Sequence, residues 1–324
     1  MKRKTAVLGN DPVAEEAAED FMTASGSAVG AVLAGFFAAA GAYAGVLLGP
    51  VSLLVGGIGQ GVRAFDGRLR QPGLGTKRPR GFTVDEPIPD AARVGVPAGV
   101  AAVLVAYAYD GGQSLGSVLR AGVRRAERSG APARARLLGR IRAVGAGALA
   151  EAGFTRALLR VAGPSEGGLL TPSDFARIPD VDVPALERPG WGGIVAEPPW
   201  SRKLAQLGEP ARLGIGYAVC AVDARGVLAA LCYRRVDAGL DVGELEVEAP
   251  LCAVPVRRGV ARYAPGVPLP APAPIGLYRE RAHVPIMEAL ACPAALALAD
   301  EPAASLRLRR DPATLEVDLV RGVP

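Results

Sequence analysis

The sequence SGSAVGAVLAGFFAAAGAYAGVLLGPVSLLVGGIGQGV, residues 25–62, contains no charged side chain and is rich in Gly and Ala. Residues 26–45 predict a helix of small residues that ends at Gly49-Pro50. Residues 51–55 are an apolar run of strand length, and a Gly-rich turn at 56–61 leads into a second strand pattern. Because small side chains let neighbouring backbones approach closely, the stretch favours a helix packed against a sheet.

The same stretch leaves a membrane span as an alternative, since an apolar run of about 20 residues can cross a bilayer. The Gly-Pro and Gly-rich interruptions favour a soluble core instead, and we expect no membrane association. The basic N-terminus is followed by an apolar run of only residues 5–8, which is too short for a signal peptide. We therefore expect a cytoplasmic protein.

Composition restricts the classes of site that the chain can carry. Half of the 324 residues are hydrophobic but only 5% are aromatic, so the core must be built from Ala, Val and Leu. The net charge of +5 comes mainly from Arg, and the Arg-rich run 120–142 has a clear apolar face and no interleaved aromatics. That pattern is more typical of a solvated helix face than of a nucleic-acid surface, so we expect no nucleic acid partner.

No residue pattern indicates a metal or a cofactor. His283 is the only histidine, which excludes a multi-His metal site and a Ser-His-Asp triad. Four cysteines show no paired ligand spacing: Cys220, Cys232, Cys252 and Cys292. The glycines of residues 56–61 have the wrong spacing for a dinucleotide fingerprint. We expect neither metal nor cofactor.

The remaining chain places most helical patterns in its first half and most strand patterns in its second. Helical patterns occupy residues 13–24, 98–109, 114–128 and 135–161, with a further short helix at 284–298. Strand patterns occupy residues 5–8, 216–222, 227–233 and 251–256. This distribution predicts layered α+β packing around an antiparallel sheet rather than alternating βαβ units.

Nine stretches, in order along the chain, resemble motifs of the γ-glutamyltransferase family. They are PVAEEAAED at 12–20, SGSAVGAVLA at 25–34, GGIGQG at 56–61, DGRLRQP at 66–72, VGVPAG at 94–99, GGLLTPSD at 167–174, GIVAEPP at 193–199, GYAVCAVDARG at 216–226 and PLPAPAP at 268–274. They are spread over most of the chain, although the family itself is markedly longer.

The resemblance implies a four-layer αββα sandwich of the N-terminal-nucleophile hydrolase type. It also implies one domain over residues 1–324, in which 1–200 resembles the family's large subunit and 214–324 its small subunit. In that family a Thr cleaves the peptide bond before it, and the freed Thr then attacks a γ-glutamyl amide with its own amine as base.

Matched position by position, the resemblance implies that this chemistry is lost. The nucleophilic Thr falls on Gly216, which has no side chain, and the paired substrate-binding serines fall on Pro270 and Ala271. Arg68 stands where the family has the Arg that grips the substrate carboxylate. We therefore expect an uncleaved, non-catalytic chain that acts as a scaffold, a binding module or a partner subunit. A small carboxylate at Arg68, a protein partner and a homo-oligomer are the binding functions left open.

Cys220 provides the alternative, a divergent amide hydrolase or acyltransferase. It lies two residues beyond Ala218, on the same face of the predicted strand. Self-cleavage between Val219 and Cys220 would expose a Cys with its own amine. A Cys in an apolar strand is more often a small buried hydrophobe, which is the competing interpretation.

Overall fold

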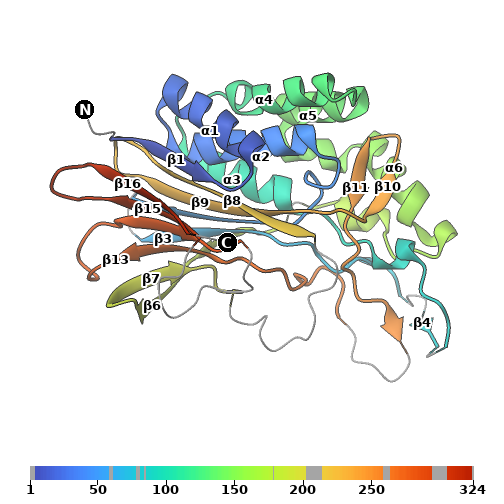
Figure 1. Ribbon diagram of the computed structural model, residues 1–324. Helices are drawn as coiled ribbons and strands as arrows, with labels where there is room; N and C mark the ends of the chain where they lie inside the picture. Colours follow the sequence, from blue (N-terminus) through green and yellow to red (C-terminus); the bar gives the residue numbers. More distant parts are fainter. Residues whose placement is uncertain are drawn as a thin grey trace.

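Two six-stranded antiparallel sheets lie face to face, and helices cover the outer face of one of them (Figure 1). The computed structural model describes residues 4–57, 61–77, 81–83, 85–177, 179–201, 214–257, 263–293 and 305–322. The first sheet has the order β1 (Ala6–Gly9), β8 (Ile215–Val222), β9 (Leu228–Arg235), β2 (Val51–Gly56), β3 (Val62–Gly67) and β5 (Asp182–Pro184). The second sheet has the order β16 (Val317–Arg321), β15 (Leu306–Arg310), β14 (Glu288–Ala291), β13 (Ile275–Arg279), β7 (Gly193–Glu197) and β6 (Leu186–Gly190).

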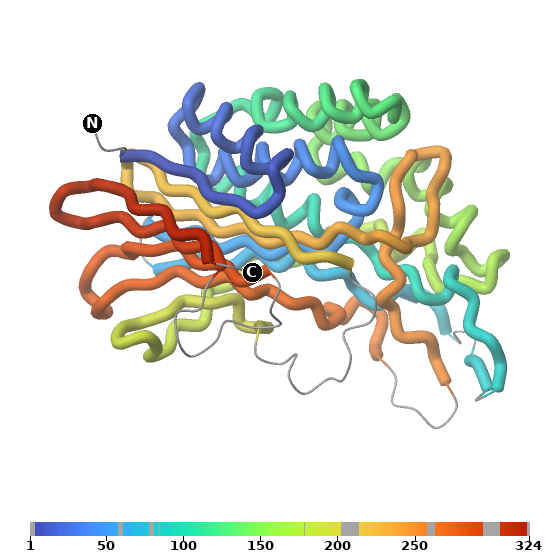
Figure 2. The backbone as a smooth tube through the Cα atoms, in the orientation of Figure 1, coloured from blue at the N-terminus to red at the C-terminus, as the bar shows by residue number. Residues whose placement is uncertain are grey.

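The first sheet combines strands from both halves of the chain, whereas all strands of the second sheet come from the second half. Figure 2 shows β1, at the blue end of the chain, beside the yellow β8, with which it pairs from Ala6 to Gly9. Two small pairs lie outside the sandwich: the hairpin of β10 (Leu240–Val242) with β11 (Val247–Ala249), and the parallel pair of β4 (Gly81–Phe82) with β12 (Val256–Arg257).

Six α-helices are described: α1 (Pro12–Ser25), α2 (Ala28–Ala42), α3 (Gly99–Asp110), α4 (Leu115–Arg128), α5 (Pro132–Val144) and α6 (Ala152–Ala162). The predicted small-residue helix is α2, which packs on β8 and β9 and is buried throughout except at Ala42. Its start is set by Ser27, whose side chain accepts a hydrogen bond from the Gly30 amide. Within the described part of the chain, no helix has both the length and the apolar character needed for a bilayer crossing.

Glycines let the backbone of α2 lie directly against the backbones of α1 and α4. A Cβ atom on Gly41 of α2 would lie 2.0 Å from the carbonyl oxygen of Gly122 in α4. A Cβ atom on Gly122 would in turn lie 2.4 Å from the carbonyl oxygen of Phe37, and one on Gly35 would lie 2.7 Å from that of Ala14 in α1. Real side chains do not tolerate such contacts, so only glycine fits where these helices meet α2.

The first sheet separates two hydrophobic cores. On β8, Val219 and Ala221 point to the helices, whereas Ala218 and Cys220 point to the second sheet. The α+β sandwich of two stacked sheets is thereby confirmed. All six α-helices of the described residues lie on the side of the first sheet, and the second helical layer of the four-layer expectation is not found among those residues.

Three sequence predictions of secondary structure are wrong. The helix predicted for 135–161 is interrupted by a 3₁₀ turn at Gly145–Ala150, because Gly145 takes a φ of 67°. The strand predicted for 251–256 reduces to an isolated bridge at Leu251 and the short β12. Of the helix predicted for 284–298, residues 284–293 are described and contain β14 instead, whose small residues Ala289 and Ala291 face the first sheet and fit between the two layers; residues 294–298 lie outside the described residues.

Replacing Gly41 by Ala tests the close contact of α2 with α4. The added methyl group would collide with the Gly122 carbonyl, so we expect a loss of about 2 kcal/mol or more in the free energy of unfolding. Gly139→Ala in α5 is the matched control, because no atom lies within 4 Å of its Cβ position. There we expect a gain of about 0.5–1 kcal/mol from helix propensity. Equal stability of the two variants in urea denaturation would contradict the contact.

Candidate functional site

The positions that the family resemblance singles out lie at one end of the first sheet. Gly216 pairs with Arg234 across β8 and β9, and Val51 pairs with both Tyr233 and Gly67. Arg68, one residue beyond Gly67, therefore belongs to the same row as Gly216, roughly 14 Å away at ordinary strand spacing. Strand alternation directs Gly216 to the same side as Ala218, toward the second sheet.

The space beside Gly216 is closed. A Cβ atom on Gly216 would lie 2.3 Å from the carbonyl oxygen of Pro293. Four prolines contribute to the wall of the cavity here: Pro50, Pro272, Pro274 and Pro293. The cavity has a volume of about 10 Å³, which is no more than one water molecule occupies. Among the described residues, the cavity at this end of β8 is therefore too small for an acyl group.

Arg68 is held by a carboxylate of this chain. Its Nε and Nη2 donate to the two oxygens of Asp66 at 2.9 and 2.8 Å. The guanidinium also lies 4.7 Å from the ring centre of Trp200, whose Nε1 donates to Ser52. With only 17% of its side chain exposed, Arg68 has its planar fork already filled. Sequence analysis identified Arg68 but not its partner, although Asp66 stands two residues earlier in the same motif.

Cys220 lies four residues further along β8 than Gly216. It pairs with Ala230 and has no exposed surface. Burial, with a smaller contribution from Cys232, raises the pKa of the Cys220 thiol to about 12. The thiolate, which is the nucleophilic form, is therefore not populated at neutral pH.

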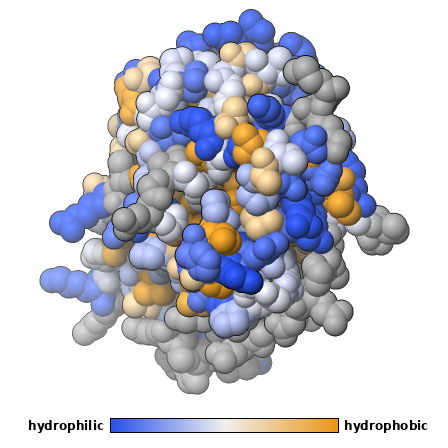
Figure 3. Space-filling view, turned by 90° about the vertical axis from the view of Figure 1, so that its left-hand side faces the viewer, coloured by the Kyte–Doolittle hydropathy of each residue, from blue (hydrophilic) through white to orange (hydrophobic). Residues whose placement is uncertain are grey.

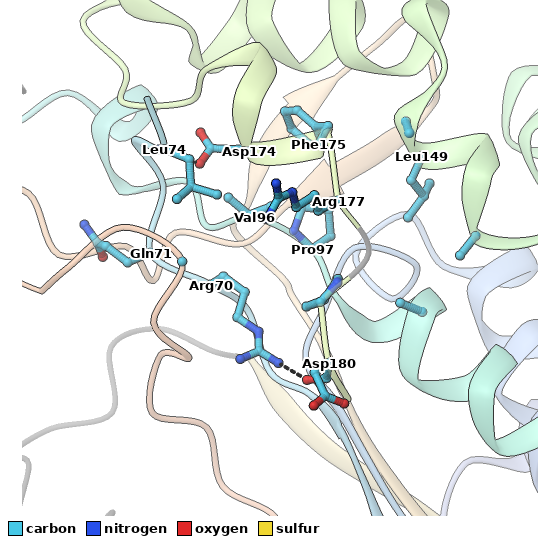
Figure 4. Close-up of a pocket in the computed structure, with 15 residues that line it drawn as sticks. Arg70, Gln71, Leu74, Val96, Pro97, Leu149, Asp174, Phe175, Arg177 and Asp180 are labelled. Carbon is cyan, nitrogen blue, oxygen red and sulfur yellow. Dashed lines mark hydrogen bonds between the residues drawn. The ribbon is translucent and has the colours of Figure 1, made fainter. Parts of the chain in front are cut away.

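An open pocket lies close to this end of the sheet and is shown in Figure 4. It has a volume of about 350 Å³ and is lined largely by apolar side chains, among them Leu74, Val96, Leu149 and Phe175. Arg70, two residues after Arg68, contributes the buried charge (Figure 4). Cavities of this size hold small molecules.

Arg70 is only partly satisfied by its surroundings. One of its terminal nitrogens lies 3.6 Å from a carboxylate oxygen of Asp66, which Arg68 already occupies, and 3.4 Å from the backbone oxygen of Asp180. Its Nε is buried and has no hydrogen-bond partner in the described ranges. Burial lowers the pKa of the Arg70 guanidinium from its usual value. Sequence analysis missed this residue; the second Arg of the DGRLRQP motif was the available signal.

Asp174 shapes the pocket wall and is not available to a ligand. Its carboxylate accepts hydrogen bonds from the amides of Gly73, Leu74 and Thr171, at 3.1, 2.9 and 2.8 Å, and from the Thr171 hydroxyl. These bonds fix the segment after Arg70 against the 3₁₀ turn Pro172–Phe175. Among the described lining residues, Arg70 is the one with a buried side-chain donor that has no hydrogen-bond partner.

Thiol labelling tests the burial of Cys220. Because Cys220, Cys232 and Cys252 are buried and their thiol pKa values are raised to about 12, we expect a thiol reagent at about pH 8 to spare all three in the folded protein. Cys292 is partly exposed and is the expected native site, whereas denaturant should expose all four. Peptide mapping that found rapid native labelling of Cys220 would contradict this.

Comparison with solved structures identifies the fold. A cephalosporin acylase from Bacillus halodurans superposes with a TM-score of 0.61 over 76% of this chain and 69% of the acylase chain, at 14% identity. A γ-glutamyltranspeptidase from Pseudomonas nitroreducens superposes with a TM-score of 0.51 over 61% of this chain and 72% of that chain, at 19% identity. At the sequence level, no family model and no curated protein matches the chain. The chain therefore has the N-terminal-nucleophile hydrolase fold of the acylase and γ-glutamyltranspeptidase structures.

Proposed function

We propose that this chain is a non-catalytic binding protein built on the N-terminal-nucleophile hydrolase fold. The observation that carries the proposal is the closed surroundings of Gly216, the residue that the motif resemblance assigns to the nucleophile position: the Pro293 carbonyl oxygen lies 2.3 Å from where a Cβ atom would be. A glycine supplies no attacking atom, and the closed space beside it admits no substrate. Both requirements for acyl transfer at this position are therefore missing.

The ligand of this binding protein is a small carboxylate with an apolar body, bound in the Arg70 pocket rather than at Arg68. The Nε/Nη2 edge of Arg68 is filled by Asp66, whereas Arg70 lines an apolar cavity and its Nη2 has only long contacts, of 3.4–3.6 Å. A carboxylate would accept shorter hydrogen bonds from the Arg70 guanidinium, and the apolar wall would accept the rest of the molecule.

The alternative of an amide hydrolase that uses Cys220 requires a reactive thiolate and access to it. Burial opposes both, because it raises the pKa of the thiol and leaves no exposed surface on the residue. The experiment below separates the two proposals.

Intact-mass measurement of the purified protein tests the loss of catalysis. We expect one uncut chain that releases no amine from a γ-glutamyl anilide, and we expect Gly216→Thr to restore no activity because its side chain collides with Pro293. Two fragments that meet within residues 214–220 would contradict the proposal. So would turnover that disappears in Cys220→Ala, which would favour the hydrolase instead.

Calorimetric titration tests the Arg70 pocket. We expect 4-phenylbutyrate to bind more tightly than acetate, because only the former fills the apolar wall. Replacing Arg70 by Met removes a charged donor and should weaken binding about tenfold or more. Arg63→Met is the control, since Arg63 pairs with Asp182 and does not line the pocket. Unchanged affinity in Arg70→Met, or equal binding of both carboxylates, would contradict the assignment.

A further inference from the structure

A second cavity, of about 530 Å³, lies at the opposite end of the sandwich from Gly216. It is bordered by the turn between β8 and β9, by the connection from β13 to β14 and by the turn after β15. The length of β8 from Gly216 to Val222 separates the two ends by roughly 20 Å. Figure 3 views the molecule from this end, where hydrophilic residues surround smaller hydrophobic patches.

Arg310 contributes a buried positive charge to this cavity. It is the last residue of β15 and faces the first sheet, as Leu306 and Leu308 do, with only 8% of its surface exposed. One of its terminal nitrogens donates to the Ala224 carbonyl at 3.4 Å, and its Nε is buried without a hydrogen-bond partner among the described residues. In the ranges that the structure describes, no carboxylate lies within ion-pair distance of it. A buried guanidinium without a counter-charge is costly, and an anion would compensate it.

A second arginine reaches the cavity from the same row of the second sheet. The Arg310 amide donates to the Met287 carbonyl, so these two residues lie opposite each other. The pairing of β13 with β14 places Arg279 opposite Met287 on its other side. Arg279 forms an ion pair with Glu187, but its Nε is also buried and without a hydrogen-bond partner among the described residues. The two unsatisfied donors, on Arg279 of β13 and Arg310 of β15, therefore lie on the two strands that flank β14.

The third arginine of the cavity differs from these two. Arg225 has just over half of its side chain exposed and is paired with both Asp110 and Asp223, at 2.7 and 2.9 Å. Its charge is compensated without a ligand. Arg225 is therefore a paired arginine in the same cavity with which the unsatisfied Arg310 and Arg279 can be compared.

Gly226 has no side chain and thereby leaves room for the Arg310 guanidinium. A Cβ atom on Gly226 would lie 2.4 Å from Nη1 of Arg310, and the glycine has a φ of 90°. A side chain at this position would both strain the turn and push the guanidinium away. The turn is therefore shaped to leave room for the Arg310 head group.

We propose that this cavity binds a small molecule through a phosphate group held by Arg310 and Arg279. A tetrahedral phosphate presents terminal oxygens in several directions and carries nearly two negative charges, so it matches two arginines in both geometry and charge, whereas a carboxylate supplies one charge and two oxygens in a single plane. No acidic residue is among the described residues that line the cavity. His283, Ile286 and Leu315 line the remaining space and contact the body of the ligand.

Thermal unfolding and ³¹P NMR, with pyrophosphate and a phosphomonoester such as glycerol phosphate as probes, test the proposal. We expect both probes at about 10 mM to raise the melting temperature and to broaden or shift their own phosphorus signals. Acetate at the same ionic strength should have no such effect. Arg310→Met should remove the response to phosphate and, because it removes an uncompensated buried charge, raise the melting temperature of the ligand-free protein.

Three further variants complete the test. Arg310→Lys keeps the charge but not the fork, so the affinity for phosphate should fall about tenfold while the fold is retained. Arg279→Met should also weaken binding, whereas Arg225→Gln should leave it unchanged. No response of the unmodified protein to either probe would overturn the proposal. It would equally be overturned if Arg310→Met and Arg310→Lys bound phosphate as well as the unmodified chain, or if acetate bound equally well.

Discussion

The distance between the backbones of α2 and its neighbouring helices is the constraint on which the rest of the structure depends. Gly35 and Gly41 allow α1 and α4 to approach the helix to a separation at which a methyl group would collide with a carbonyl oxygen. Because α2 itself rests on β8 and β9, this packing brings the helical layer down onto the first sheet. A core built from Ala, Val and Leu can be dense only if its layers come this close.

Local signals were enough to predict the elements nearest this contact. The small-residue run 26–45, the break at Gly49-Pro50 and the Gly-rich turn at 56–61 predicted α2, β2 and β3, and the strand patterns at 216–222 and 227–233 predicted β8 and β9. The second sheet was largely missed, because β14 is rich in Ala and Leu and carries a helical propensity that is overridden by its neighbours β13 and β15. β14 is a strand because only small residues fit between the two sheets, and a short stretch of sequence carries no information about that space.

The candidate sites likewise have some features that the sequence could predict and others that it could not. The family motifs assigned the nucleophile position to Gly216 and carboxylate binding to Arg68. The space at Gly216 is closed by Pro293, which is far away in the sequence. The Nε of Arg310 is unsatisfied because no acceptor among the described residues forms a hydrogen bond with it. Neither property is carried by a residue type or by a spacing. Both require the three-dimensional arrangement of strands from distant parts of the chain.

The contact between Gly216 and Pro293 also has a consequence for the history of the chain. A single codon change at 216 can introduce a hydroxyl group, but the new side chain would meet a main-chain oxygen that belongs to a separate segment. Any side chain at residue 216 would therefore need a prior shift of the Pro293 segment, and that shift by itself confers no chemistry. Because two changes are needed in a fixed order, this position is less accessible to mutation than an exposed position of the same chain.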